Sequence, residues 1–320
     1  MKTFGIELEE YWDYQKLPGN HPFVKTASSH CFNNGQGRMY LFGGFGPDFT
    51  VSNKLYEIDP ENSGVYNTID PGIEGRTNHD MYFWKDTIII AGGISYDYPN
   101  PLRVFQEIIL ISLPGYEVRT IRLDFIGMRF TSFFDYSAGC LYYTGGFETD
   151  NAVYKVDIAS GKIQRIDIDG SYFSRGGAAS LSFGDKAILF SGFRKENGIP
   201  HCYSDYYIYS FADGTMEHSL CSEFAGRTFS KPLLLRKYHK ILFMLGTYNG
   251  MEQSHSGVCY DYEKNMFDGL CMQDIPVSAA EPVVYYLERT DRIYISGGIT
   301  NNTVQDILWK LDTGAIPNIM

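Results

Sequence analysis

Positively charged side chains recur at a fixed distance before glycine-ended hydrophobic segments. Arg76, Arg129 and Arg175 each lie seventeen residues before the glycine that closes such a segment. An arginine side chain presents a planar fork of hydrogen-bond donors that matches a carboxylate or a phosphate. If the fold brings these side chains together, the pattern predicts a binding site for an anion.

The glycine-ended segments mark an internal repeat. Each is a short run of aliphatic and aromatic residues, and the final glycines are separated by 49, 53, 46, 54 and 52 residues. A period of about 50 residues indicates a propeller or solenoid repeat, and it exceeds the 40 to 45 residues of a WD40 unit. The segments are RMYLFGG (38–44), TIIIAGG (87–93), CLYYTGG (140–146), KAILFSG (186–192), KILFMLG (240–246) and RIYISGG (292–298).

Each repeat has the composition of four short strands. A segment that opens on a charged residue precedes the glycine-ended strand, and a tyrosine-rich strand and a more polar strand follow in most repeats. Alternating strands separated by turn residues predict antiparallel sheets, and radial repetition of such sheets makes a β-propeller. We therefore expect one all-β domain over residues 1–320, with repeats at about 25–70, 75–123, 128–168, 174–221, 226–271 and 279–313.

The last repeat is too short for a fourth strand, and the N-terminus offers a replacement. The sequence EYWDYQKLPGNHP at 10–22 has a tryptophan followed by leucine, proline and glycine, but it precedes the first repeat. We expect residues 10–17 to pair with the last repeat and close the ring. The fold predicted is a six-bladed propeller whose last blade is closed by an N-terminal strand.

The repeats resemble kelch repeats, and the resemblance covers nearly the whole chain. In a kelch blade the first strand is innermost, so the resemblance places the charged residue that opens each repeat at the mouth of a central channel. Where the loop between the first two strands is longer, the interval to the glycine is nineteen residues. The expected ring is Lys25, Arg76, Arg129, Arg175, Arg227 and Glu281.

Two roles are open for the ring. Its cations could bind an anion at the channel mouth, where a concave wall focuses their field. Each arginine could instead bond carbonyls of a neighbouring loop, as a structural feature of every repeat. The loops after the glycines border the same mouth, and loops on a rigid scaffold carry binding residues. They contribute the aromatic candidates Tyr96, Tyr98, Phe193 and Tyr248.

The kelch resemblance implies a binding propeller that recognises an acidic peptide motif or a carboxylate-bearing small molecule. A weaker resemblance to sialic acid mutarotase-type kelch proteins implies an alternative, a sugar-acid epimerase. In that alternative Glu281 or His79 would transfer protons at the anomeric hydroxyl. Sequence alone leaves open whether the protein is an enzyme.

Composition narrows the partners. The net charge is −11, from 27 basic and 38 acidic residues, which disfavours nucleic acid and anionic membranes. The first ten residues include three acidic side chains, unlike a secretion signal, and the six cysteines contain no CxxC pair. We therefore expect a cytoplasmic protein. The seven histidines are scattered and no phosphate loop is present, so we expect neither a metal nor a cofactor.

Overall fold

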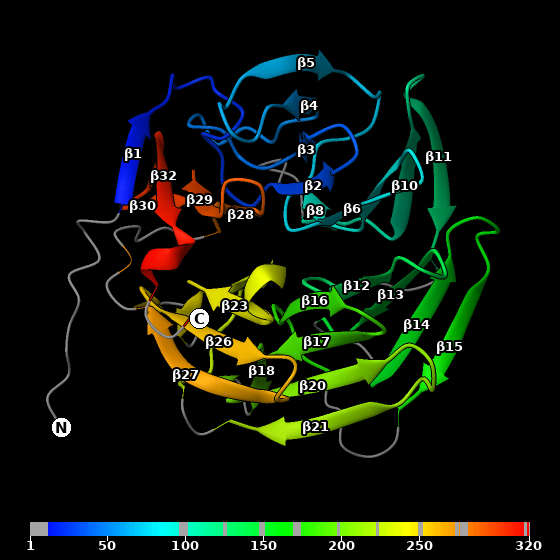
Figure 1. Cartoon of the computed structure of the whole chain (residues 1–320). Helices are drawn as coiled ribbons and strands as arrows, with labels where there is room; N and C mark the ends of the chain where they lie inside the picture. The colour runs from blue at the N-terminus through cyan, green and yellow to red at the C-terminus, as the bar shows by residue number, and fades with distance from the viewer. Residues whose placement is uncertain are drawn as a thin grey trace, which may run out of the picture.

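The chain folds into six four-stranded antiparallel sheets arranged as blades around a central channel (Figure 1). The computed structural model describes residues 12–95, 102–123, 127–146, 151–168, 174–196, 199–221, 224–248, 252–272, 275, 281–316 and 319. The prediction of an all-β, six-bladed propeller is confirmed. In these ranges no helix has the length and apolar character needed to cross a membrane.

The strands of each blade are named from the channel outwards. Blade 1 consists of β2 (Ser29–Asn33), β3 (Arg38–Phe42), β4 (Leu55–Ile58) and β5 (Val65–Ile69). Blade 2 consists of β6 (Asp80–Trp84), β7 (Thr87–Ala91), β10 (Glu107–Ser112) and β11 (Glu117–Arg122). Blade 3 consists of β12 (Thr131–Asp135), β13 (Cys140–Thr144), β14 (Ala152–Asp157) and β15 (Ile163–Asp167).

Blades 4 to 6 follow the same order. Blade 4 consists of β16 (Ala179–Phe183), β17 (Lys186–Phe190), β20 (Asp205–Ser210) and β21 (Met216–Leu220). Blade 5 consists of β22 (Lys231–Leu235), β23 (Lys240–Met244), β26 (Gly257–Asp261) and β27 (Met266–Met272). Blade 6 consists of β28 (Val283–Leu287), β29 (Arg292–Ser296), β32 (Ile307–Asp312) and β1 (Trp12–Lys16).

Short elements lie between the second and third strands of several blades or at turns. The two-stranded hairpins are β8 (Ile94–Ser95) with β9 (Arg103–Val104), β18 (Phe193–Glu196) with β19 (Ile199–Cys202), β24 (Thr247–Tyr248) with β25 (Glu252–Gln253), and β30 (Ile299–Thr300) with β31 (Thr303–Val304). The described part of the chain also contains the 3₁₀ turns η2 (Arg236–Tyr238) and η3 (Thr313–Ala315).

The hydrophobic core is divided among the junctions between blades. The described residues form six buried clusters, and each cluster draws its side chains from two neighbouring blades. Strand side chains alternate between the two faces of a sheet, so one face of a blade packs on the previous blade and the other on the next. This arrangement fixes the angle between blades and makes the channel wall rigid.

The closing strand predicted from the N-terminus is confirmed for its described residues. Strand β1 pairs antiparallel with β32, with Trp12 opposite Leu311 and Lys16 opposite Ile307. Figure 1 shows the blue β1 beside the red β32. The Trp12 indole packs edge-on against Trp309, with 6.4 Å between ring centroids. Opening the ring would therefore break a whole strand ladder.

The strand-ending glycines let neighbouring blades approach closely. Gly43 has φ of 70°, and a Cβ atom there would collide with the backbone carbonyl of Arg76 in the next blade. The adjacent Gly44 donates its N–H to that same carbonyl, with 3.0 Å between nitrogen and oxygen. Only glycine meets both the conformational and the steric demand without strain.

Candidate functional site: the central channel

The arginines that open blades 2 and 4 are held inside their own blades. Arg76 is 1% exposed and donates from Nη1 to the Gly92 carbonyl (3.0 Å) and from Nη2 to Glu107 Oε1 (3.0 Å). Arg175 is 3% exposed and bonds the Ser191 carbonyl and both carboxylate oxygens of Asp205. These contacts tie the segment just before the first strand of the blade, which we call the inner loop, to the second and third strands.

Arg227 of blade 5 is matched by neutral acceptors, and Lys25 of blade 1 lies over an aromatic ring. Arg227 Nη1 donates to Ser254 Oγ (3.0 Å) and to the Ser256 carbonyl (3.1 Å). The Lys25 ammonium lies 5.6 Å from the centroid of the Tyr56 ring. Burial lowers the pKa of both cations, and Asp48 partly opposes this for Lys25.

These four cations share one position in the blade and one structural role. Their backbone carbonyls accept the N–H of a glycine in the preceding blade, as Arg175 does from Gly146 (2.9 Å) and Arg227 from Gly192 (3.0 Å). None of the four is among the described residues that line the channel cavity. As ligand-binding residues, Lys25, Arg76, Arg175 and Arg227 stay a prediction.

The assignment of Arg129 and Glu281 to this same position was wrong, because the first hairpins of the blades differ in length. In blade 2, Trp84 pairs with Thr87 and two residues join the strands, whereas in blade 3 Asp135 pairs with Cys140 and four residues join them. The equivalent of Arg76 in blade 3 is therefore Gly127, which lies against Gly146. In blade 6 it is position 279, outside the described residues.

Arg129 and Glu281 occupy a second ring, two residues further along each blade. The six residues of this ring all have left-handed backbone conformations: Ala27 (φ 55°), Asn78 (50°), Arg129 (59°), Gly177 (64°), Phe229 (58°) and Glu281 (53°). Four of them donate their N–H to a carbonyl of the same ring in the preceding blade: Ala27 to Glu281 (3.0 Å), Asn78 to Ala27 (3.1 Å), Gly177 to Arg129 (3.0 Å) and Phe229 to Gly177 (2.8 Å). We call these six residues the mouth ring.

Two side-chain contacts cross the mouth ring, each over a small residue. Asn78 donates from Nδ2 to Glu281 Oε2 (2.6 Å), spanning Ala27 between them. The Arg129 guanidinium lies 4.6 Å from the centroid of the Phe229 ring, spanning Gly177. A Cβ on Gly177 would approach the Phe229 ring to 2.7 Å, so the bridge requires a glycine there.

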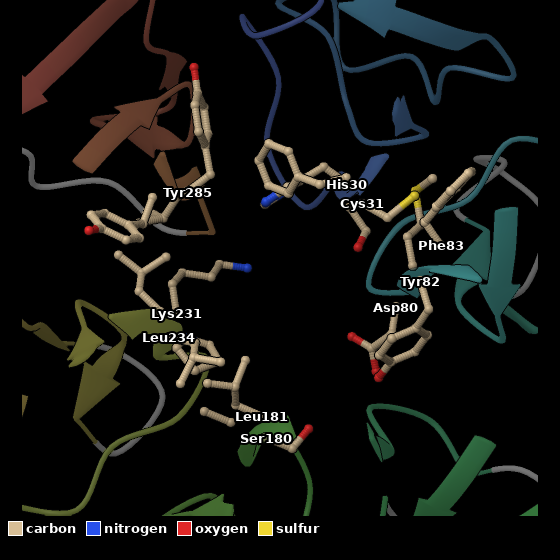
Figure 2. A pocket seen from close by; sticks show the side chains of 18 of the residues that line it. His30, Cys31, Asp80, Tyr82, Phe83, Ser180, Leu181, Lys231, Leu234 and Tyr285 are labelled. Atoms are coloured by element: carbon tan, nitrogen blue, oxygen red, sulfur yellow. The ribbon is translucent and has the colours of Figure 1, made fainter. Parts of the chain in front are cut away.

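Below the mouth ring, the channel encloses a cavity of about 1110 Å³. Its wall is formed by the innermost strands of all six blades, and predicted candidates Arg129, Glu281 and His79 contribute to it. Figure 2 shows further lining side chains from β2, β6, β16, β22 and β28 around the open centre. A cavity of this size accommodates a small organic ligand.

Among the described residues that line the cavity, three cations have no anionic partner: Arg129, Lys231 and Arg236. Their side chains make neither a hydrogen bond nor an ion pair, although the Arg129 guanidinium stacks on Phe229. In Figure 2 the Lys231 ammonium points into the open centre. These groups are accessible to an anion without breaking an existing salt bridge.

A carboxylate lies opposite Lys231. Asp80 accepts a hydrogen bond from Ser132 Oγ (2.6 Å), and Ser132 Oγ lies 2.8 Å from the Tyr82 hydroxyl. Burial raises the pKa of Asp80, and the Ser132 bond and the charge of Lys231 oppose the rise. The cavity therefore contains both signs of charge rather than cations alone.

Two histidines near the channel are held neutral at physiological pH. Burial, then the charges of Arg76 and Lys231, lower the pKa of His79 to about 3. Burial and the charge of Lys231 lower the pKa of His30 to about 4. His79 packs edge-on against Phe42, with 5.6 Å between ring centroids.

The predicted aromatic candidates lie away from the cavity or outside the described residues. Phe193 is 7% exposed and begins β18, where it forms a bridge with Gly176. The Tyr248 ring lies 5.6 Å from the Arg227 guanidinium, and its hydroxyl lies 3.2 Å from Ser254 Oγ. Tyr96 and Tyr98 lie outside the described residues. As ligand contacts, all four stay predictions.

Sequence reasoning missed Lys231, Asp80 and His30, which line the cavity. Asp80 and Lys231 are each the first residue of an innermost strand, two residues beyond the mouth ring. The signal that could have identified Asp80 and Lys231 is a charged residue at the start of the first strand of a blade. To recognise it, the repeats have to be aligned with allowance for the length of the hairpin between the first two strands.

Comparisons with known proteins bear on the fold. No family model matches the chain, and no curated protein matches it. Among solved structures the chain is similar to one titled "Structure of YjhT", with a TM-score of 0.68 and 14% sequence identity. The match covers 88% of this chain and 93% of that chain. It supports the propeller fold, and membership of the kelch family stays a prediction.

Proposed function

We propose that this protein is a binding propeller whose central channel takes a ligand carrying a carboxylate. The observation that carries the proposal is the contrast between its cations. The inner-loop cations, Lys25, Arg76, Arg175 and Arg227, are buried against their own blades. Arg129 and Lys231 instead line the cavity without an anionic partner among the described residues. A desolvated cation in a concave site attracts an anion more strongly than the same group on an open surface.

A small ligand fits this geometry better than a folded partner. The mouth is narrowed by the Asn78–Glu281 and Arg129–Phe229 contacts, and the unpaired Lys231 lies below them. An acidic peptide that enters from the mouth would have to deliver one carboxylate past these contacts. Recognition of such a peptide, and a cytoplasmic location, remain expectations from the sequence.

The propeller fold is also compatible with the sugar-acid epimerase, but no observation favours that function over binding. Its proton-transfer candidates are His79, whose pKa is lowered to about 3, and Glu281, which is hydrogen-bonded to Asn78. A general base works best with a pKa near the operating pH. We therefore propose binding and assign no reaction.

Calorimetric titration with glutarate, N-acetylneuraminate and a short Asp/Glu peptide tests the proposal. We expect at least one small carboxylate to bind, and Arg129→Gln and Lys231→Gln each to weaken binding by about 10- to 100-fold, the loss of one charge-assisted hydrogen bond. Lys54→Gln is the matched control, because Lys54 pairs with Asp70 on the outer surface. Unchanged affinity in both channel variants would contradict the proposal.

A further inference from the structure

Asp80 and Lys231 occupy the same position in opposite blades. Asp80 is the first residue of β6 in blade 2, and Lys231 is the first residue of β22 in blade 5. Each lies two residues after its mouth-ring residue, Asn78 or Phe229. In a ring of six blades, the second and the fifth face each other across the axis. Figure 2 shows the carboxylate and the ammonium on facing walls of the cavity.

The two charges interact across the open centre without touching. Burial raises the pKa of Asp80 and the charge of Lys231 opposes that rise, but the two groups form no ion pair within 4.0 Å. Two opposite charges that face each other across a cavity can be bridged by a ligand that carries the complementary pair.

Asp80 has acceptor capacity left for a ligand. Its hydrogen-bond partners within the described residues all belong to Ser132, whose hydroxyl is in turn oriented by the Tyr82 hydroxyl. A carboxylate offers about four lone-pair sites, and Ser132 fills only part of them. The chain from Tyr82 to Ser132 fixes the orientation of the carboxylate, which a rigid binding site requires.

The mouth ring repeats the opposition of charge one layer above. Arg129 of blade 3 and Glu281 of blade 6 also occupy equivalent positions in opposite blades. The four formal charges of the two layers sum to zero. A ligand with an anionic end and a cationic end leaves this balance unchanged, whereas a simple anion adds one uncompensated charge to a desolvated site.

We propose that the channel binds a zwitterionic ligand that spans it, an amino-bearing carboxylate with its carboxylate at Lys231 and its ammonium at Asp80. This inference rests on the proposed binding of carboxylates and adds the second recognition group. An ammonium donates three hydrogen bonds, so it suits the free acceptor sites of Asp80. A hydroxyl could also donate there but would leave the carboxylate charge uncompensated.

The test is calorimetric titration of the full chain with chain-length-matched probes. The zwitterions are 4-aminobutyrate and 6-aminohexanoate, and the matched anions are butyrate and hexanoate. The probe 6-hydroxyhexanoate separates hydrogen-bond donation from charge, and hexylamine carries the cation alone. We expect at least one zwitterion to bind about tenfold or more tightly than its matched anion, from one added charge-assisted hydrogen bond. The hydroxy acid should lie between them.

Variants at the two walls decide the assignment. Asp80→Asn should remove the preference for the zwitterion and leave the affinity for the simple anion equal or higher. Lys231→Gln should weaken zwitterion and anion alike. The matched surface control is Asp70→Asn, because Asp70 pairs with Lys54 away from the channel. Thermal unfolding of each variant shows that it is folded, and Ser132→Ala, which removes the bond to Asp80, provides a second test of the same group.

The outcomes separate the two proposals. If the simple anions bind and the zwitterions bind no more tightly, the zwitterion assignment is overturned while the carboxylate site stands. If the preference for zwitterions persists in folded Asp80→Asn, Asp80 is not the recognition group and the assignment is again overturned. If no probe binds the wild type, both proposals fail.

Discussion

Two sets of cations occupy positions that differ by two to four residues in the register of a blade, and they lie in entirely different environments. Arg175 is buried and bonded to Asp205, whereas Arg129 stands on the channel wall and stacks on Phe229. The first set is tied to the second and third strands of its own blade, and the second faces the cavity. A side chain of one type therefore serves the scaffold or the cavity according to its register in the inner loop.

The largest expected effect is on stability, from removing a buried member of the first set. Arg175→Met removes the arginine partner of Asp205, whose side chain is 6% exposed, and leaves only His218 Nε2 (3.0 Å) beside that carboxylate among the described residues. We expect the free energy of unfolding to fall by about 3–5 kcal/mol, as when one partner of a buried ion pair is removed. Urea unfolding measures it. Arg129→Met is the matched control and should cost less than about 1 kcal/mol, the value of an exposed cation–π contact. Equal losses would abolish the distinction between the two sets.

A smaller effect is expected on the pH dependence of stability when His79 is replaced by glutamine. The folded pKa of His79 is about 3, below the unfolded value of 6.5, so the folded state resists protonation. Its contribution to stability is fully present above pH 6.5 and is lost as pH falls towards 3. The groups around it are Arg76, Lys231 and the ring of Phe42.

We expect His79→Gln to remove a slope of about 1.4 kcal/mol per pH unit between pH 6 and pH 4. Urea unfolding at three pH values, for wild type and variant side by side, measures the difference in slope. Parallel stability curves would mean that His79 is protonated as readily in the folded protein as in the unfolded chain.

The smallest effect is expected at the mouth ring. Arg129 has φ of 59°, a conformation that glycine adopts without strain and that Gly177 adopts at the equivalent place. Arg129→Gly should therefore change the free energy of unfolding by less than about 1 kcal/mol, because relief of strain offsets the lost contact with Phe229. The same variant should bind carboxylates more weakly than wild type. A loss of stability as large as that of Arg175→Met would assign Arg129 to the scaffold.

Much of the fold could be predicted from residues alone. Glycine-ended apolar strands at a period of about 50 residues indicated six equivalent sheets, and the misplaced Trp12 segment indicated how the ring closes. Both signals are local. A glycine is required where another backbone lies close to it, and a tryptophan is required where it packs against the edge of a blade, independently of the rest of the sequence.

The site was predicted less well, for a geometric reason. Arg129 and Glu281 were placed by their distance from a glycine, but that distance includes a hairpin whose length varies between two and four residues. A shift of two residues keeps a side chain on the same face of a strand, so no pattern of polarity reveals the error. It moves the residue from the inner loop to the mouth ring.

The sequence by itself determined the number of blades, the closing strand and the presence of one cation at the start of most repeats. Only the tertiary structure decided which cations are neutralised by their own blade and which face the cavity. It also decided that Asp80 and Lys231, 151 residues apart in the sequence, stand opposite each other. The reason is that local spacing follows from backbone geometry within one blade, whereas opposition across a channel depends on the closure of all six.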